Sequence, residues 1–397
     1  MTSRRALSLL AGVAILAGCG GGTSSTGSGG ASAVNNVQPI QVTFGPANDM
    51  VNGLYTSVTI CVPGTADCQT IDGVEVDTGS VGLRLLGSRV TLPLPRMTDA
   101  SGNALANCVS YADNSYTWGP MAAADVRMAG EQAASVPIQI IGAPVFADAP
   151  SDCSSGGTAA DTVSALGANG ILGLAVFRQD CGSACSGGRP PAIYFGCPPA
   201  SPCAVTPVPL QSQLQNPVWL FPQDNNGVLV SLPSIPADGA PTVAGSLIFG
   251  IGTQANNALG SARVYTTDDV GNFSTVFNGT TYSSSYLDTG SNGFFFQDSD
   301  TIGFPSCPDG NSDFSCPPTT VSLTATNIGH NGTSASVAFS VANAESLFNT
   351  PNAAFNDLAG PDTGDFDWGL PFFFGRKTFI AIEGQSTAGG TGPYWAY

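Results

Sequence analysis

The chain has 397 residues, and its 28 acidic side chains outnumber its 11 basic ones, which gives a formal net charge of −17. Nucleic-acid binding depends on basic patches that neutralise phosphates, so this balance argues against it. His330 is the only histidine, which leaves too few ligands for a multi-histidine metal site. Gly and Pro are frequent and the apolar runs are short, so we expect an all-β fold of many short strands.

The N-terminus carries the features of an export signal. Two arginines precede an apolar segment, residues 6–17, that is too short to span a bilayer. The segment leads into Leu-Ala-Gly-Cys at residues 16–19, which resembles a bacterial lipobox. We therefore expect residues 1–18 to be a signal peptide and Cys19 to be the lipidated first residue of the mature protein. The alternative is an ordinary secretory signal with a chance cysteine.

Membrane attachment would then come from the lipid on Cys19, because an anionic membrane surface would repel so acidic a chain. Gly20 follows the cysteine, and by resemblance to other lipoproteins this favours the outer membrane, either its periplasmic face or the cell surface. Residues 19–38 are rich in Gly, Ser, Thr and Ala, and they predict a flexible tether.

The cysteine count fits an exported protein. One of the 11 cysteines is assigned to lipidation, and the even remainder suits disulfides in an oxidising compartment. Cysteines that are close in sequence could pair and close small loops, which would leave one distant couple. The close pairs are Cys61/Cys68, Cys181/Cys185, Cys197/Cys203 and Cys307/Cys316, and the remaining couple is Cys108 and Cys153. The sequence alone does not fix this connectivity.

Strand signals begin near residue 42, where apolar and polar residues start to alternate, most clearly over residues 55–60. Polar turns then lead into an apolar strand at residue 74. This strand ends in Asp-Thr-Gly-Ser-Val-Gly at residues 77–82, and a second apolar run follows.

The same plan returns in the second half of the chain. A strand over residues 273–277 is followed by Asn-Gly, a strong hairpin signal, and by a strand over residues 280–287. That strand ends in Asp-Thr-Gly-Ser-Asn-Gly at residues 288–293. We interpret the repeat as an internal duplication that forms an N-terminal lobe, residues 39–252, and a C-terminal lobe, residues 253–397.

Other segments predict further strands and one loop. Residues 109–111 and 125–128 could form a hairpin around the polar segment 112–115. A third Asp-Thr-Gly, at residues 362–364, lacks apolar strands on both sides and is expected to be a loop. The remaining predicted strands are a buried run at 170–175, the last strand of the first lobe at 245–250, and two pieces at 368–374 and 378–382.

Two carboxylates that are placed by the same local sequence suggest a catalytic pair. When Asp77 and Asp288 share one site, repulsion between like charges raises one pKa, so one carboxyl is protonated while the other is ionised. The ionised carboxylate can take a proton from a bound water while the protonated one polarises a scissile carbonyl. This chemistry uses no metal and no cofactor, and we expect neither.

The residues after each aspartate would support the pair. The glycines would admit backbone amides close to the carboxylates, the threonines would donate hydroxyl bonds across the lobe boundary, and the serines would orient their own aspartate. In that order, these residues are Gly79 and Gly290, Thr78 and Thr289, and Ser80 and Ser291.

These motifs, in this order, resemble those of pepsin-like aspartic peptidases over residues 40–385, in what looks like a bacterial lipoprotein branch. The resemblance implies a bilobal fold with a cleft between two β-rich lobes. It also implies that Gly173 and Gly369 lie beside the two aspartates and that Tyr111 is the flap tyrosine that covers bound peptide. The Cys307/Cys316 region falls where pepsins carry a second-lobe disulfide.

The chain departs from the family pattern near the first aspartate. Arg84 stands where the family often has a tryptophan that bonds to the flap tyrosine. Glu75 lies on the same strand face as Asp77, where an apolar residue is usual, and it could perturb the pair or form an ion pair with Arg84. The flap segment 112–114 lacks the usual glycines.

We therefore expect a membrane-tethered, monomeric aspartic endopeptidase that cleaves peptide or protein substrates at acidic pH. The alternative is a catalytically silent pepsin-like envelope lipoprotein that binds peptides or surface ligands. A weaker third reading is a lipid-anchored structural β-protein without a cleft. His330 lies in a turn-like setting and is expected to be exposed rather than catalytic.

Overall fold

The structure of the chain, a computed structural model, describes residues 35–146, 148–297, 303–308 and 310–397. The proposed signal peptide, Cys19 and most of the proposed tether lie outside these residues, and the assignments made there remain predictions.

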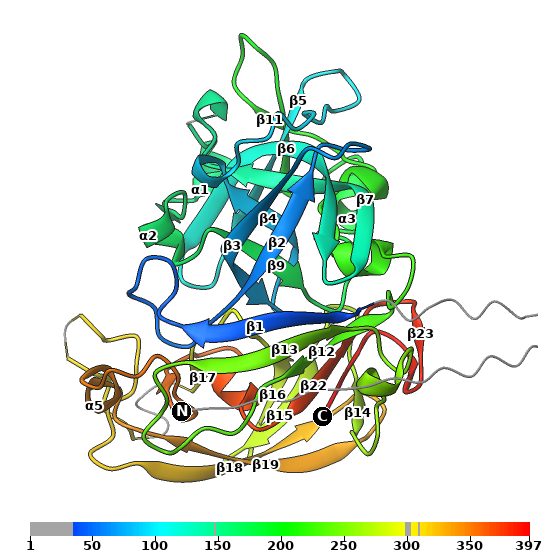
Figure 1. Ribbon diagram of the computed structural model, residues 1–397. Helices are drawn as coiled ribbons and strands as arrows, with labels where there is room; N and C mark the ends of the chain where they lie inside the picture. Colours follow the sequence, from blue (N-terminus) through cyan, green and yellow to red (C-terminus); the bar gives the residue numbers. More distant parts are fainter. Residues whose placement is uncertain (1–34, 147, 298–302, 309) are drawn as a thin grey trace, which may run out of the picture. The chain divides into compact units, whose positions relative to one another are not determined.

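Strands account for most of the regular structure, and the prediction of an all-β fold is confirmed (Figure 1). The first half of the described chain contributes β1 (Val37–Thr43), β2 (Gly53–Cys61), β3 (Cys68–Asp77), β4 (Val81–Leu86), β5 (Ala104–Ser110), β6 (Ser115–Met128), β7 (Glu131–Ile141), β8 (Thr158–Ala159), β9 (Gly170–Leu174), β10 (Tyr194–Cys197), β11 (Ala204–Val205), β12 (Gly227–Ser231) and β13 (Val243–Phe249). The second half contributes β14 (Val264–Thr266), β15 (Phe273–Phe277), β16 (Thr280–Leu287), β17 (Phe294–Phe296), β18 (Val321–Ile328), β19 (Ser334–Val341), β20 (Ala359–Gly360), β21 (Phe366–Trp368), β22 (Lys377–Ala381), β23 (Ser386–Thr387), β24 (Gly390–Thr391) and β25 (Tyr394–Ala396).

The described helices are single turns that connect strands. The α-helical turns are α1 (Ser151–Ser154), α2 (Val163–Leu166), α3 (Ser183–Ser186) and α5 (Ala344–Phe348). The 3₁₀ turns are η1 (Gly87–Arg89), η2 (Pro144–Phe146), η3 (Leu210–Ser212), η4 (Pro217–Leu220), η5 (Ala255–Asn257) and η6 (Leu370–Phe373).

The strands form two large sheets. A 16-stranded sheet follows the order β11-β10-β5-β6-β7-β4-β9-β3-β2-β1-β13-β12-β22-β25-β14, with β8 paired to β6. A seven-stranded sheet follows the order β19-β18-β15-β16-β21-β17-β20. Because β12 pairs with β22 from Gly227↔Ala381 to Ser231↔Lys377, the larger sheet continues across the predicted lobe boundary at residues 252 and 253 (Figure 1).

The internal duplication appears as the same three-strand arrangement in both sheets. β9 lies between β3 and β4, parallel to β3 and antiparallel to β4. In the second half, β21 lies between β16 and β17, parallel to β16 and antiparallel to β17. Each Asp-Thr-Gly loop therefore connects the two outer strands of its triplet: β3 to β4 in the first half and β16 to β17 in the second.

The hairpin predicted from Asn-Gly is confirmed. β15 pairs with β16 in antiparallel register, with Phe277 opposite Thr280. Asn278 and Gly279 form the two-residue turn with φ values of 48° and 81°. Positive φ at both central residues is the geometry that matches the twist of paired strands, which explains why this dipeptide occurs here.

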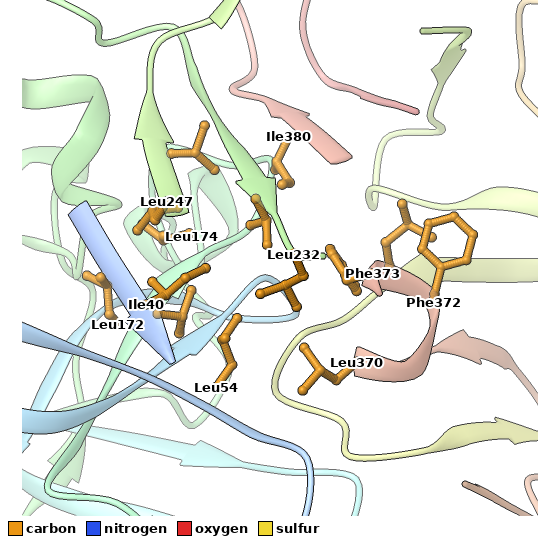
Figure 2. Close-up of a cluster of buried hydrophobic side chains, with 14 of the residues drawn as sticks. Ile40, Leu54, Leu172, Leu174, Leu232, Leu247, Leu370, Phe372, Phe373 and Ile380 are labelled. Carbon is orange, nitrogen blue, oxygen red and sulfur yellow. The ribbon is translucent and has the colours of Figure 1, made fainter. Parts of the chain in front are cut away.

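The apolar core joins residues of both halves. Figure 2 shows Leu174 of β9 and Leu370, Phe372 and Phe373 of η6 in one cluster, with Leu232 between them. All five side chains are buried. Each buried side chain of this size stabilises the fold by roughly 1.5–3 kcal/mol, so this core holds the halves together.

Two sequence expectations need correction. Residues 368–374 were expected to be a strand, but β21 ends at Trp368 and η6 follows, because Pro371 cannot donate to a strand ladder. The tether was expected to reach residue 38. Instead, Asn36 is 1% exposed and its side chain donates to the Phe249 carbonyl at 2.8 Å, so the folded part has already begun at this residue.

Five disulfides are present in the described chain, and they match the pairing suggested by sequence proximity. They are Cys61–Cys68, Cys108–Cys153, Cys181–Cys185, Cys197–Cys203 and Cys307–Cys316. Disulfides in this number indicate an oxidising, extracytoplasmic compartment. Among the residues that the structure describes, no helix is long and apolar enough to cross a membrane.

The disulfides differ in how much of the chain they constrain. Cys108 and Cys153 are 45 residues apart, whereas Cys181 and Cys185 are 4 apart. Loop-closure entropy predicts that removing Cys108–Cys153 by paired Cys→Ala substitutions lowers the free energy of unfolding by about 4 kcal/mol, against about 2 kcal/mol for Cys181–Cys185. Urea unfolding of the two double variants measures this difference, and equal losses would contradict it.

Candidate active site

The two Asp-Thr-Gly loops meet and are joined by reciprocal hydrogen bonds. The Thr78 amide donates to Thr289 Oγ1 at 3.1 Å, and the Thr289 amide donates to Thr78 Oγ1 at 3.0 Å. The two hydroxyls then donate onward, from Thr78 to the Leu287 carbonyl at 2.8 Å and from Thr289 to the Val76 carbonyl at 2.6 Å. Both threonine side chains are fully buried. The bonds that the sequence predicted across the boundary are therefore present.

The first loop folds around its own carboxylate. Asp77 is 7% exposed. Its Oδ1 accepts hydrogen bonds from the amides of Gly79 at 2.7 Å and of Ser80 at 3.1 Å. Its Oδ2 accepts a hydrogen bond from the Ser80 hydroxyl. These donors fix the orientation of the carboxylate.

The second loop repeats this arrangement. Asp288 Oδ1 accepts from the Gly290 amide at 2.7 Å, and its Oδ2 accepts from the Ser291 hydroxyl at 2.8 Å. The Asp288 amide donates to the Trp368 carbonyl at 3.1 Å, which anchors the start of the loop on β21. Gly369, the residue after Trp368, packs so closely that a Cβ atom there would lie 2.0 Å from the Gly293 carbonyl oxygen.

The two carboxyl groups share a hydrogen bond with each other. Each is approached by the glycine of the opposite loop: a Cβ atom at Gly79 would lie 2.7 Å from Asp288 Oδ2, and one at Gly290 would lie 2.8 Å from Asp77 Oδ1. Gly173 is paired with Asp77 across β3 and β9, so it lies beside the first aspartate. Glycine is required at 79 and 290 because any side chain would push the carboxyls apart.

The electrostatics of the pair favour one shared proton. Desolvation raises the pKa of Asp288 well above its ordinary value, and the neighbouring charge of Asp77 raises it further. Hydrogen bonds from Ser291 and Gly290 oppose this rise without cancelling it. A carboxyl that stays protonated beside a hydrogen-bonded carboxylate can donate a proton while its partner accepts one.

Glu75 adds an acid two residues before Asp77, on the same strand face. Burial raises its pKa well above the ordinary value, and the charges of Asp77 and Asp288 add to this rise. The ion pair with Arg84 that the sequence suggested is not the one that forms in the described chain: Arg84 Nη2 lies 3.7 Å from Asp180 Oδ2.

Arg84 and Asp180 form a buried network at one wall of the site. Arg84 is 1% exposed, and its Nη1 donates to the Val81 carbonyl at 2.6 Å. The Tyr194 hydroxyl donates to Asp180 Oδ1 at 2.6 Å. Burial raises the pKa of Asp180 to about 6, although the positive charge of Arg84 opposes the rise.

Asp367 is an acidic residue of the site that the sequence analysis did not identify as functional. It is 4% exposed and pairs in register with Tyr286, two residues before Asp288. Burial raises its pKa well above the ordinary value, the charge of Asp288 adds to this, and a hydrogen bond with Ser291 opposes it. The available signal was an acid two positions before Gly369, directly before the strand predicted at residues 368–374.

Tyr111 is the first residue of the turn in a β5–β6 hairpin, so the hairpin expected around residues 112–115 is present. Ser110 pairs with Tyr116, and residues 111–114 form the turn. Asn114 takes a positive φ of 62°, so asparagine fills the left-handed position for which a glycine was expected. Burial raises the pKa of the Tyr111 phenol; the charge of Arg84 opposes this rise, while that of Asp77 adds to it.

The second strand of this hairpin begins earlier in the sequence than expected. Residues 125–128 were proposed to return beside 109–111, but β6 begins at Ser115 and runs for 14 residues. Its first part pairs with β5 and its second part pairs with β7, which leaves 125–128 beside β7 and β2. The sequence signal located the second part of one long strand.

A cavity of about 610 Å³ opens beside the aspartate loops. Both halves line it: residues 78–81 and the hairpin residues 108–110 from the first, and Val270, Tyr286 and Trp395 from the second. Val270 is 69% exposed, so its apolar side chain is free for contact with a ligand. A cavity next to the carboxyl pair provides room for a side chain of a ligand.

The remaining candidates lie away from this site. Residues 362–364 form a loop, as expected, in which Thr363 and Gly364 are exposed and the Gly364 amide donates to Asp362 Oδ1 at 2.8 Å. This is the same local turn as at Asp77, but without an opposing loop. His330 is exposed, as predicted. Within the described ranges, no three acidic, histidine or cysteine side chains are grouped as metal ligands.

Fold and site together define an all-β protein in which two Asp-Thr-Gly loops of a duplicated chain converge on one pair of carboxyls. The chain belongs to the DUF3443 family, described as "Protein of unknown function (DUF3443)", whose profile matches residues 32–397. A comparison with curated proteins finds no match.

The buried acids predict how stability depends on pH. Burial raises the pKa of Asp180 and of Asp357 to about 6, whereas unfolded carboxyls titrate near about pH 4. Between these values the folded state binds more protons, so stability is greatest at the acidic end and is lost as the pH rises. We expect a free energy of unfolding at least about 2 kcal/mol higher at pH 5 than at pH 8.

Urea unfolding of the oxidised protein at the two pH values measures this difference. Asp357→Asn is expected to reduce it, while the exposed control Asp67→Asn leaves it unchanged. A free energy of unfolding that increases from pH 5 to pH 8 would refute the prediction.

Proposed function

We propose that this protein is an aspartic-type endopeptidase with a pepsin-like bilobal fold. The observation that carries the proposal is the convergence of Asp77 and Asp288, with a hydrogen bond between their carboxyls and the same donors around each. Two aspartates in one site, one protonated and one ionised, form the general acid and general base of metal-free peptide hydrolysis.

The reaction follows from the polarity of the pair. The ionised carboxylate removes a proton from a water molecule, whose oxygen attacks the scissile carbonyl carbon. The protonated carboxyl donates its proton to the carbonyl oxygen, which gives a neutral tetrahedral intermediate. The pair then gives a proton to the amide nitrogen and takes one from a hydroxyl of the intermediate, which breaks the carbon–nitrogen bond and restores the singly protonated pair. Because the proton is shared, its two titration steps belong to Asp77 and Asp288 together.

The surroundings of the pair support a peptide substrate. The cavity beside it has apolar walls that include Val109 of the hairpin and Phe177 of the first half, with Val270 from the second. Tyr111 lies at the tip of the same hairpin and within electrostatic range of Asp77. A cavity at this position also weighs against a purely structural role.

Export and tethering complete the proposal. Five disulfides indicate an oxidising compartment. The lipobox-like residues 16–19 support attachment of the mature protein to the outer membrane through lipid on Cys19. The enzyme would then act on peptides at the periplasmic face or at the cell surface.

A second candidate is a catalytically silent protein that binds peptides in the same cleft. The observation that favours it is Glu75, a further acid beside the pair whose pKa is raised by desolvation and by the charges of Asp77 and Asp288. A further carboxyl there would compete for the proton that Asp77 and Asp288 share. This candidate predicts peptide binding without turnover from about pH 3 to pH 7, the range in which carboxyls of this kind titrate.

Substitution of either aspartate tests whether the protein is a peptidase or a catalytically silent binding protein. Asp77→Asn and Asp288→Asn are each expected to lower kcat for an unfolded casein substrate at acidic pH by at least about a hundredfold, because each removes one partner of the general acid–base pair. A statine-type transition-state mimic is expected to inhibit the unsubstituted protein.

Asp362→Asn is the matched control, since it alters an Asp-Thr-Gly loop that has no opposing loop. Full activity in Asp362→Asn together with loss in the other two variants is the expected pattern. Unchanged cleavage in both Asp77→Asn and Asp288→Asn would exclude the proposed mechanism, and binding without any turnover would favour the silent protein.

The membrane tether has its own test. Cys19→Ala is expected to abolish incorporation of a labelled fatty acid and to release the protein from the membrane fraction, because Cys19 is the proposed attachment point. Cys181→Ala, which removes a disulfide cysteine, serves as the control and should retain the label. Labelling that survives in Cys19→Ala would contradict the assignment.

A further inference from the structure

Asp367 lies on the same face of the sheet as Asp288. β21 is the middle strand between β16 and β17, and Asp367 pairs with Tyr286 on one side and Phe295 on the other. Residues that pair across strands point to the same face, and so do residues two apart along a strand. Asp367, Tyr286 and Asp288 therefore share one face.

The Ser291 hydroxyl lies between the two acids. It donates to Asp288 Oδ2 at 2.8 Å, and Asp367 lies within reach of the same hydroxyl. A serine hydroxyl carries one proton and can donate only once. While Ser291 donates to Asp288, a hydrogen bond to Asp367 requires a proton from Asp367 itself. A protonated Asp367 satisfies this geometry, whereas a hydroxyl turned toward Asp367 would lower its pKa.

The rest of the surroundings point the same way. Asp367 Oδ1 is buried and has no hydrogen-bond partner in the described structure. The charges that act on Asp367 are those of Asp288, Asp362 and Asp77, all negative, and Tyr286 faces it across the strand pair as a neutral phenol. An ionised carboxylate here would be a buried charge without a counterion, which is strongly unfavourable.

We propose that Asp367 is a third acid of the site, a positioning residue that shares a proton with Asp288 through the Ser291 hydroxyl. The proton balance is simple: when Asp367 gives its proton to Ser291 Oγ, Ser291 gives its own proton to Asp288, and the reverse transfer restores the starting state. The effect on catalysis rests on the proposed peptidase function, whereas the protonation of Asp367 does not.

The shared proton extends the pH range in which the aspartate pair is singly protonated. Removing the last proton would leave negative charges on Asp77, Asp288 and Asp367 together, and like charges in one site oppose this ionisation. With a neutral residue at 367, only two carboxyls share the charge. The pair then loses its proton at lower pH.

Asp367→Asn keeps the size and hydrogen-bonding capacity of the side chain but cannot exchange a proton. We expect the basic limb of its pH profile for kcat/KM to move downward by about one pH unit, which is about a tenfold loss of activity on that limb, with little change at the acidic optimum. Ser291→Ala, which breaks the connection, should show the same shift. Asp67→Asn, an exposed acid in the turn between β2 and β3, should show none.

Infrared spectroscopy provides a readout that does not need turnover. At pH 7 the unsubstituted protein is expected to show one more protonated-carboxyl carbonyl stretch than Asp367→Asn, while the exposed control Asp67→Asn matches the unsubstituted protein. Urea unfolding at the same pH checks that each variant is folded, and Asp367→Glu, which retains an exchangeable proton, should restore the band.

Equal protonated-carboxyl bands in the folded unsubstituted protein and Asp367→Asn would overturn the proposal, as would a pH profile that does not move. A protein that shows the extra band but no peptide cleavage at any pH would retain the shared proton and would instead refute the peptidase function. The two failures are thus distinguishable.

Discussion

The reciprocal hydrogen bonds between Thr78 and Thr289 are the constraint on which the site depends. Two carboxyls at hydrogen-bonding distance repel each other whenever both are ionised, so something must hold their backbones together. Here each threonine accepts from the opposite amide and donates to a carbonyl of the opposite strand. Because both side chains are fully buried, these bonds cannot be replaced by water without a cost of about 1–3 kcal/mol for each unpaired group.

Those bonds are effective because the strands behind them are rigid. Asp77 ends β3 and Asp288 follows β16, and each strand is fixed by a neighbour from its own triplet, β9 or β21. The larger sheet then carries β22 and β25 of the second half beside β12 of the first. A duplicated chain whose halves share a sheet and a core cannot separate at the site without disrupting both.

The sequence was informative where a local rule determines the structure. Asn278-Gly279 requires positive φ values, so the hairpin and the strand into Asp288 could be predicted, and the close cysteine pairs needed only short loops. Asp367 could not be identified, because its role depends on a strand register that brings it beside Tyr286 across 80 residues of chain. The partner of Arg84 was likewise non-local: Asp180, not nearby Glu75, reaches its guanidinium.

The buried acids at the site lower the stability of the folded state, and the rest of the molecule offsets this cost. Asp288, Glu75 and Asp367 all have pKa values raised first by burial, so each destabilises the folded state once the pH rises far enough to ionise it. A small core would not tolerate several such groups, since net stability is only about 5–15 kcal/mol. Disulfides and a core shared by both halves offset the cost. The site can therefore retain these acids. Their burial is unfavourable for stability, but it raises their pKa values and so allows them to share protons.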